Sequence, residues 1–281
     1  MNYGKRSDDK DFGGGGQGNL STIRGFGAGK APFRATEKRM ITRGFTLAEV
    51  LITLGIIGVV AAMTLPSLIQ KNNNKVVETR LKKFYSSINQ AILMAEADYG
   101  DKKIWYEDLA GADVDDEGNV IEGSSEAEAW FRKYFAPYMK ITKIENLKSG
   151  ISSGSLIVYF ADGSALRTRR KDSTRDWDFF PGNVNKCINS QKAAEGFRDT
   201  GGRCSFAFNF MPSATTEKWK YHYNRGFEPY KFNWDGNTET LYNDSKYGCN
   251  STGSSWRQYC TAIIQMNGWK IPDDYPYKVS Y

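Results

Sequence analysis

Residues 44–66 read GFTLAEVLITLGIIGVVAAMTLP, and no residue from Val50 to Gln70 carries a charge. An α-helix rises about 1.5 Å per residue, so about 20 apolar residues are needed to cross the roughly 30 Å hydrocarbon layer of a bilayer. The uncharged run has about that length. It therefore predicts a helix that spans a membrane.

The charges around this run indicate its direction and mark a candidate site. Residues 1–44 hold nine Lys or Arg and four Asp or Glu (9 − 4 = +5), and the rest of the chain holds 29 and 28 (+1). A cationic excess stays on the cytoplasmic side of a span, so the amino terminus is predicted to face the cytoplasm. The nearly neutral remainder gives no charge argument for nucleic-acid binding. Glu49 lies inside the start of the apolar run, where an ionisable group is costly unless it is paired, which predicts a functional role.

A short basic segment, then Gly44-Phe45, then Glu49, resembles the amino-terminal processing motif of type IV pilins and type II secretion pseudopilins. In that family a membrane aspartyl peptidase cuts after the glycine and methylates the new amino terminus. The resemblance implies cleavage between Gly44 and Phe45, N-methylation of Phe45, and pairing of Glu49 with that amine, commonly on a neighbouring subunit. It also implies that Pro66 bends the helix. Ala48 departs from the pattern, because the family usually has a larger aliphatic residue there.

Four parts are expected along the chain. The first is a leader that ends at Gly44, and its Gly-rich start has a composition that cannot bury a core. Met40 is an alternative translation start, which would make residues 1–39 a spurious extension. The expected parts are the leader (1–44), a transmembrane or filament-core helix (45–66), an amphipathic continuation of that helix (67–99) and a globular head (100–281).

The head is predicted to be α+β. Apolar residues recur every three or four positions from Val77 to Ala95, which predicts an amphipathic helix, with a weak point at Asn72–Asn74. The other expected elements are a helix capped by Ser125 and Glu128, a β-hairpin (155–160 with 165–169), a strand (204–210), two strand-like pieces (227–232 and 238–242) and a closing helix (256–266). With the resemblance, this predicts a pilin-like fold. A long amino-terminal helix, transmembrane in its first half, packs on a small antiparallel β-sheet domain with a disulfide-stapled carboxy-terminal region.

The four cysteines, Cys187, Cys204, Cys249 and Cys260, all lie in the last third of the chain. An even number in an exported domain predicts disulfides, and three pairings are open. Cys187 with Cys204 and Cys249 with Cys260 is favoured because each pair closes a short loop, and the resemblance also implies a disulfide in the carboxy-terminal loop. Zinc is disfavoured, since there is no Cys-x-x-Cys and only one histidine.

Few other residues suggest chemistry. The single histidine, His222, is interpreted as a surface or packing residue, and with no nucleophile elbow or phosphate loop we do not expect an enzyme. No cofactor is expected. Calcium is an alternative, because the resemblance includes pseudopilins with a calcium-binding loop, and Asp235, Asn237 and Glu239 place oxygen ligands at alternate positions. A strand-connecting turn explains these three residues equally well. The basic cluster that begins at Arg167 is predicted to be a solvated hairpin edge.

The sequence thus predicts a structural subunit of a type IV pilus or a type II secretion pseudopilus. Its expected partners are copies of itself and related pilins, the prepilin peptidase, an inner-membrane assembly platform and, before assembly, membrane lipid. The expected location is the bacterial inner membrane, crossed once with the head outside the cytoplasm, and then a periplasmic or cell-surface filament. One alternative is a signal-anchored envelope protein that never polymerises. Another is a minor tip pilin that binds a surface or DNA through Trp219, Trp234, Trp256 and Trp269, although DNA binding is disfavoured.

Overall fold

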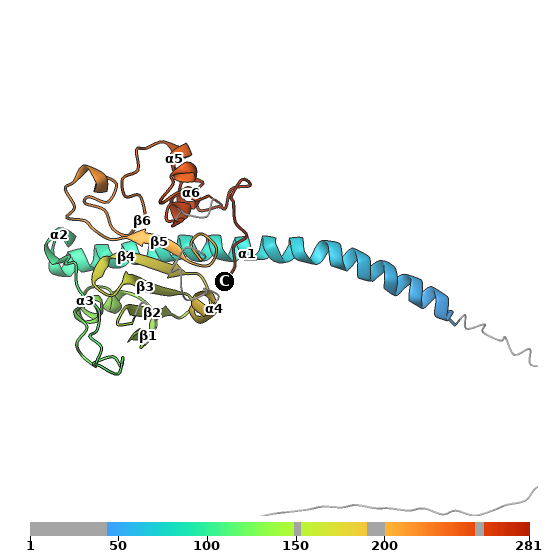
Figure 1. Ribbon diagram of the computed structural model, residues 1–281, viewed down its shortest axis with the longest axis horizontal. Coiled ribbons are helices and arrows are strands. Elements are labelled where there is room, and N and C mark those ends of the chain that lie inside the picture. Colours follow the sequence, from blue (N-terminus) through green and yellow to red (C-terminus); the bar gives the residue numbers. More distant parts are fainter. Residues whose placement is uncertain (1–43, 149–152, 190–199, 251–255) are drawn as a thin grey trace, which may run out of the picture. The chain divides into compact units, whose positions relative to one another are not determined.

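The computed structural model describes residues 44–148, 153–189, 200–250 and 256–281. The chain separates into two units, Met1–Leu51 and Ile52–Tyr281. The second unit is built from most of a long helix, α1 (Leu47–Tyr99), and a six-stranded sheet that packs on the last part of that helix (Figure 1). This is the predicted pilin-like α+β fold.

Helix α1 changes character along its length. Its apolar first part is exposed, whereas the buried positions begin at Val77 and continue to Ala95 with the predicted helical spacing. The buried residues are Val77, Leu81, Phe84, Ile88, Ala91, Ile92 and Ala95. Pro66 lies inside the helix, which continues past it as expected. The amphipathic stripe is confirmed, and it is the surface on which the sheet packs.

The sheet is an antiparallel meander in which every strand pairs with the next one along the chain. Its strands are β1 (Ile141–Asn146), β2 (Leu156–Phe160), β3 (Ala165–Arg170), β4 (Ser173–Phe180), β5 (Phe206–Asn209) and β6 (Glu228–Pro229). The predicted β2–β3 hairpin and the strand at β5 are confirmed. Strands β1 and β4 were not predicted.

Aromatic side chains fill the space between α1 and the sheet. Phe84 of α1 stacks on Phe179 of β4 with a centroid distance of 4.3 Å and meets Phe208 of β5 edge-on at 5.1 Å. It also contacts Phe160 and Phe227. Three of these rings come from different strands, β2, β4 and β5, and the fourth, Phe227, directly precedes β6. Phe84 thus connects the helix with the sheet.

The opposite face of the sheet contradicts the prediction of a solvated hairpin edge. Arg167 is buried, and Arg169 forms a bidentate ion pair with Asp178 of the adjacent strand β4. Burial lowers the pKa of Arg167 to about 10. In β4, Trp177 and Phe179 belong to the core beneath α1, while Asp178 alternates to the other face. Arg167 and Arg169 therefore form an internal ion-pair layer with Asp178 of the unpredicted strand β4. In contrast, Arg170 of the same cluster is exposed and pairs with exposed Asp172.

Short helices complete the head. They are α2 (Lys102–Trp105), α3 (Glu126–Tyr134), α4 (Val184–Asn189), α5 (Thr238–Asn243) and α6 (Cys260–Met266), with 3₁₀ turns at Ala136–Tyr138 and Glu217–Trp219. The Ser125 hydroxyl accepts a hydrogen bond from the Glu128 N–H at 3.1 Å, which confirms the predicted cap of α3. The closing helix begins four residues later than expected, at Cys260, and Gly268 follows it with φ +68°.

The predicted strand at 238–242 is wrong, because this segment is helix α5. The Asn237 side chain accepts a hydrogen bond from the Glu239 N–H at 3.0 Å, which is an N-cap. The Asp235 carboxylate accepts from the Thr240 hydroxyl at 2.8 Å and fixes the same turn. The piece at 227–232 retains only the two-residue strand β6, with Pro229 on the edge of the sheet, where the missing N–H of proline is tolerated.

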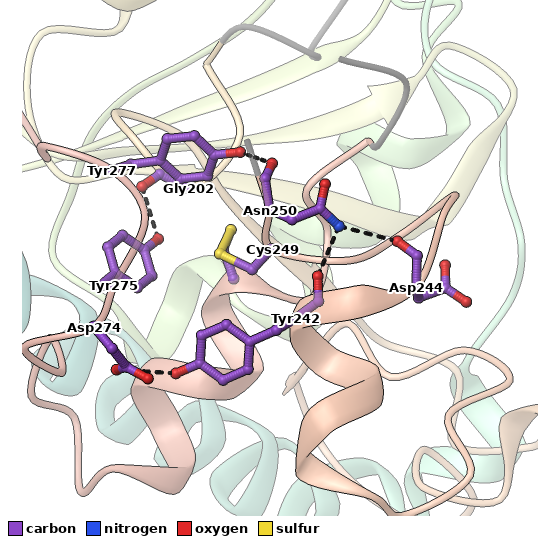
Figure 2. The surroundings of a disulfide bond; sticks show 9 residues. Gly202, Tyr242, Asp244, Cys249, Asn250, Asp274, Tyr275 and Tyr277 are labelled. Atoms are coloured by element: carbon purple, nitrogen blue, oxygen red, sulfur yellow. Dashed lines mark hydrogen bonds between the residues drawn. A yellow bond between two sulfur atoms is a disulfide. The ribbon is translucent and has the colours of Figure 1, made fainter. Parts of the chain in front are cut away.

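Two disulfides join Cys187 to Cys204 and Cys249 to Cys260, the short-loop pairings. Beside Cys249, the carboxy-terminal tail is held by two tyrosines (Figure 2). The Tyr275 hydroxyl donates to the Gly202 carbonyl at 2.7 Å, and the Tyr277 hydroxyl donates to the Asn250 carbonyl. The second disulfide thus lies next to the contacts that position the end of the chain.

The tail then reaches α1 and explains the polar run that we interpreted as a weak point. Gln70 and Asn73 donate hydrogen bonds to the Val279 carbonyl at 3.2 and 3.4 Å. Asn72 lies within 3.4 Å of the Tyr281 hydroxyl. The helix is unbroken here, and its amide side chains bind the carboxy terminus.

Candidate assembly motif at the amino terminus

Gly44 and Phe45 are the first residues that the structure describes. Phe45 is 88% exposed. A Cβ atom added to Gly44 would meet no atom within 4 Å, and the φ of Gly44 lies outside the left-handed region. Neither packing within the described chain nor backbone conformation therefore requires glycine at this position.

Glu49 closes the first turn of α1 in a capping box with Thr46. The Thr46 N–H and hydroxyl both donate to Oε2 of Glu49 at 2.8 Å, and the Glu49 N–H donates to the Thr46 hydroxyl oxygen at 3.2 Å. This reciprocal arrangement satisfies backbone donors that a helix start leaves unpaired. Glu49 was predicted as a candidate site from the sequence but Thr46 was not, although the Thr-x-x-Glu spacing is the signature of such a box.

The apolar surface that follows is large, and no described residue of the chain covers it. An 18-residue window of α1 has a mean hydropathy of 2.2 and no buried residue, and among the described residues only this helix is long and apolar enough to span a membrane. Gly55, Gly58 and Ala62 follow one another at helical spacing, so they lie on one face. A Cβ atom on either glycine would meet nothing within 4 Å. This face allows another helix to approach closely.

The calcium alternative concerns residues that already have local partners. Asp235 accepts from the Asn237 N–H at 2.9 Å and from Thr240, and Asn237 caps α5. Within the described ranges, no group of three or more His, Cys, Asp or Glu side chains is placed to hold a metal ion. The oxygen pattern that suggested calcium is accounted for by the start of a helix.

Tryptophans that could stack on DNA bases instead pack within the head. Trp234 is buried, packs on the tilted ring of Tyr221 at a centroid distance of 4.7 Å and donates its indole N–H to the Asn237 carbonyl. Trp219 packs on Phe232 at 4.6 Å, and Trp269 packs on Tyr85 of α1 at 4.9 Å. These three rings are used for internal packing.

His222 is fully buried, so it is a packing residue and not a surface one. Its Nε2 atom accepts a hydrogen bond from the Lys231 N–H at 3.1 Å. Burial, together with the nearby charge of Lys231, lowers the pKa of His222 to about 3, against a small opposing effect of Asp176. The imidazole is therefore neutral in the folded head at neutral pH.

This burial predicts a pH-dependent stability. His222 ionises near pH 6.5 when unfolded and near 3 when folded, so below pH 6.5 only the unfolded chain takes up the proton. The stabilisation is complete above pH 6.5 and is lost as the pH falls toward 3, by about 2 kcal/mol at pH 5, since one pKa unit corresponds to about 1.4 kcal/mol. Urea unfolding between pH 7 and 5 measures it. His222→Gln keeps an acceptor but cannot titrate there, and an unchanged slope in that variant would assign the effect elsewhere.

The exposed apolar helix, its amino-terminal glutamate and the α+β head define a membrane-anchored protein of the pilin or pseudopilin type. Residues 39–65 match the prokaryotic N-terminal methylation motif. Residues 67–279 match a family of unknown function (DUF6613), and the chain belongs to that family. The boundary between the two matches falls at Pro66, within the exposed part of α1 and before the buried positions that begin at Val77. No curated protein and no solved structure matches the chain.

Proposed function

We propose that this chain is a filament subunit of a type IV pilus or a type II secretion pseudopilus. A prepilin peptidase cuts the precursor between Gly44 and Phe45 and methylates the Phe45 amine. Before assembly, the mature subunit is anchored in the bacterial inner membrane with its head outside the cytoplasm. An inner-membrane assembly platform then transfers it from lipid into a filament of identical and related subunits.

The observation that carries this proposal is the uncovered apolar half of α1, headed by Glu49. Burying a large aliphatic side chain contributes about 1.5–3 kcal/mol, so such a surface needs either lipid or other helices around it. The small-residue face of Gly55, Gly58 and Ala62 suits packing against neighbouring helices. In a plain membrane anchor Glu49 would serve only as the helix cap with Thr46, whereas in a filament its carboxylate can also pair with the Phe45 amine of a neighbouring subunit.

Gly44 supports the processing step. Because neither packing nor backbone conformation of the described chain requires glycine at position 44, we infer that a second protein that binds this segment requires it. An extended segment without a side chain fits closely into a peptidase, because backbone can approach backbone. The exposure of Phe45 leaves this segment accessible in the described chain.

The mature amino terminus tests the proposal directly. In cells that carry the assembly machinery, we expect the intact mass of the exported protein to begin at Phe45, increased by one methyl group, and the protein to be recovered in sheared surface or periplasmic filaments. Gly44→Lys is expected to leave the full leader attached. A wild-type protein that retains residues upstream of Phe45 would instead identify an uncut signal-anchored envelope protein.

A further inference from the structure

Three lysines form an exposed stripe on α1, just after the apolar segment. Lys71, Lys75 and Lys82 lie within about 40° of one another around the helix axis, because each residue turns the helix by about 100°. All three are exposed, and the described part of the chain offers their ammonium groups no ion pair. We call these residues the lysine stripe.

Neighbouring charges on α1 are already used. Lys83 pairs with Asp162 at 2.7 Å, and Arg80 donates to the Pro181 carbonyl. Glu78, which lies beside the stripe, accepts a hydrogen bond from the Ile271 N–H at 2.8 Å. The stripe is therefore the set of positive charges in this region for which the described head provides no partner.

A second surface carries the opposite charge. Residues 113–126, DVDDEGNVIEGSSE, contain six carboxylates and no Lys or Arg, and we call them the acidic segment. Two of the six have local partners: Asp113 lies 3.6 Å from Lys171, and Asp115 accepts from Asn119. The other four are exposed and have no basic partner among the described residues: Asp116, Glu117, Glu122 and Glu126.

The two surfaces lie toward opposite ends of the packed part of α1. The stripe begins at Lys71, and the helix from there to Tyr99 is about 42 Å long at about 1.5 Å per residue. The acidic segment leads into α3, whose Tyr134 packs on Tyr99 and on Trp105 of α2, at ring distances of 5.0 and 4.6 Å. Figure 1 shows α2 and α3 together at that far end.

We propose that the lysine stripe of one subunit docks on the acidic segment of the next copy in the filament. This inference rests on the proposed function and specifies one of its contacts. Complementary charge on two different patches joins copies head to tail, and a head-to-tail contact extends without closing when its rotation does not form a ring. The charges set register and orientation, while the apolar helices supply cohesion.

Anionic lipid is a weaker partner for the whole stripe. Lys82 lies about 16 Å beyond Lys71 along the helix, at about 1.5 Å per residue. A headgroup layer is only about 5–8 Å thick on each side of the hydrocarbon core. A bilayer that ends near Gln70 would therefore reach Lys71 and Lys75 but not Lys82.

Charge reversal and its rescue test the contact in cells that assemble the wild-type chain. Lys71→Glu/Lys75→Glu/Lys82→Glu should lower the filament yield about tenfold or more, because attraction becomes like-charge repulsion. Asp116→Lys/Glu117→Lys/Glu122→Lys should do the same. The six-fold variant, which restores complementarity, should recover most of the yield. The matched control Lys186→Glu/Lys218→Glu/Lys270→Glu changes the net charge equally at exposed positions and should assemble normally.

The outcomes separate this inference from the proposed function. A six-fold variant no better than either triple variant, with normal amino-terminal processing and normal wild-type filaments, overturns the docking and leaves the filament role intact. Absence of wild-type filaments overturns the filament role itself. Carbodiimide treatment of wild-type filaments, which links amines to nearby carboxylates, should join stripe peptides to acidic-segment peptides between subunits. Stripe lysines linked only to other carboxylates would contradict the contact.

Discussion

Phe84→Ala is expected to lower the free energy of unfolding of the head by about 3–5 kcal/mol, the usual cost of emptying a buried phenylalanine site. Phe84 is 4% exposed and contacts four phenylalanines from the sheet and the loop before β6. Those rings are held by the pairing of β2, β4 and β5, so they have little freedom to close around the void. The substitution therefore weakens the joint between α1 and the sheet.

Urea unfolding of the full chain in a mild detergent, with disulfides intact, measures this effect. Leu93→Ala is the matched control, because Leu93 is on the same helix but 66% exposed, and its cost should stay within about 0.5 kcal/mol. Similar losses in both variants would mean that packing of Phe84 on the sheet does not determine the change, because alanine is the better helix former at both positions and propensity alone predicts no loss. A loss confined to Phe84 would show that the aromatic cluster fastens α1 to the head.

The sequence was sufficient for elements whose pattern is local. The stripe from Val77 to Ala95 has helical periodicity, the β2–β3 hairpin has an Asp-Gly turn, and β5 alternates apolar and polar residues. In each case the signal lies within a few consecutive residues of the segment itself. Local periodicity therefore predicted the helix, the hairpin and the strand that build the core.

Strand β4 could not be found in this way, because both of its faces are buried for different reasons. Phe179 contacts Phe84 of α1, while Asp178 meets Arg167 and Arg169 of the adjacent strand. In isolation, interleaved charges such as Asp176 and Asp178 indicate a solvated edge, and only the long-range pairing reverses that interpretation. Helix α5 was mistaken for a strand because the capping role of Asn237 was interpreted as a turn between strands.

The candidate site shows the same division. Gly44, Phe45 and Glu49 follow one another closely, so a motif in the sequence was enough to predict them as a site. Thr46 was not predicted, although its spacing to Glu49 is equally local and the Thr-x-x-Glu pattern was sufficient to predict the cap. The attachment of the tail at Gln70 and Asn73 joins residues about 200 positions apart, and neither segment has a pattern that indicates the other.

Glu49→Ala is expected to leave cleavage and methylation intact but to lower incorporation into filaments by about a hundredfold to a thousandfold. In the proposed filament, the Glu49 carboxylate and the methylated Phe45 amine of a neighbouring subunit are buried together. Removing one partner of a buried ion pair leaves the other charge uncompensated, at a cost of about 3–5 kcal/mol. The measurement is the ratio of the variant in sheared filaments to the variant in membranes, together with the intact mass of the mature protein.

Two further variants separate this charge from the capping role that the structure shows. Glu49→Gln retains an oxygen that can accept from Thr46 but has no charge, so it should fail to assemble as Glu49→Ala does. Thr46→Ala removes the reciprocal cap while keeping the carboxylate, and since a lost N-cap costs about 1 kcal/mol, it should assemble within about fivefold of wild type. The reverse result, with Glu49→Gln competent and Thr46→Ala defective, would mean that Glu49 acts by starting α1 and that no intersubunit ion pair is needed. In the precursor Glu49 can act only as the cap of α1, because the amine of Phe45 is created by the peptidase. The intersubunit ion pair becomes available to Glu49 only after cleavage.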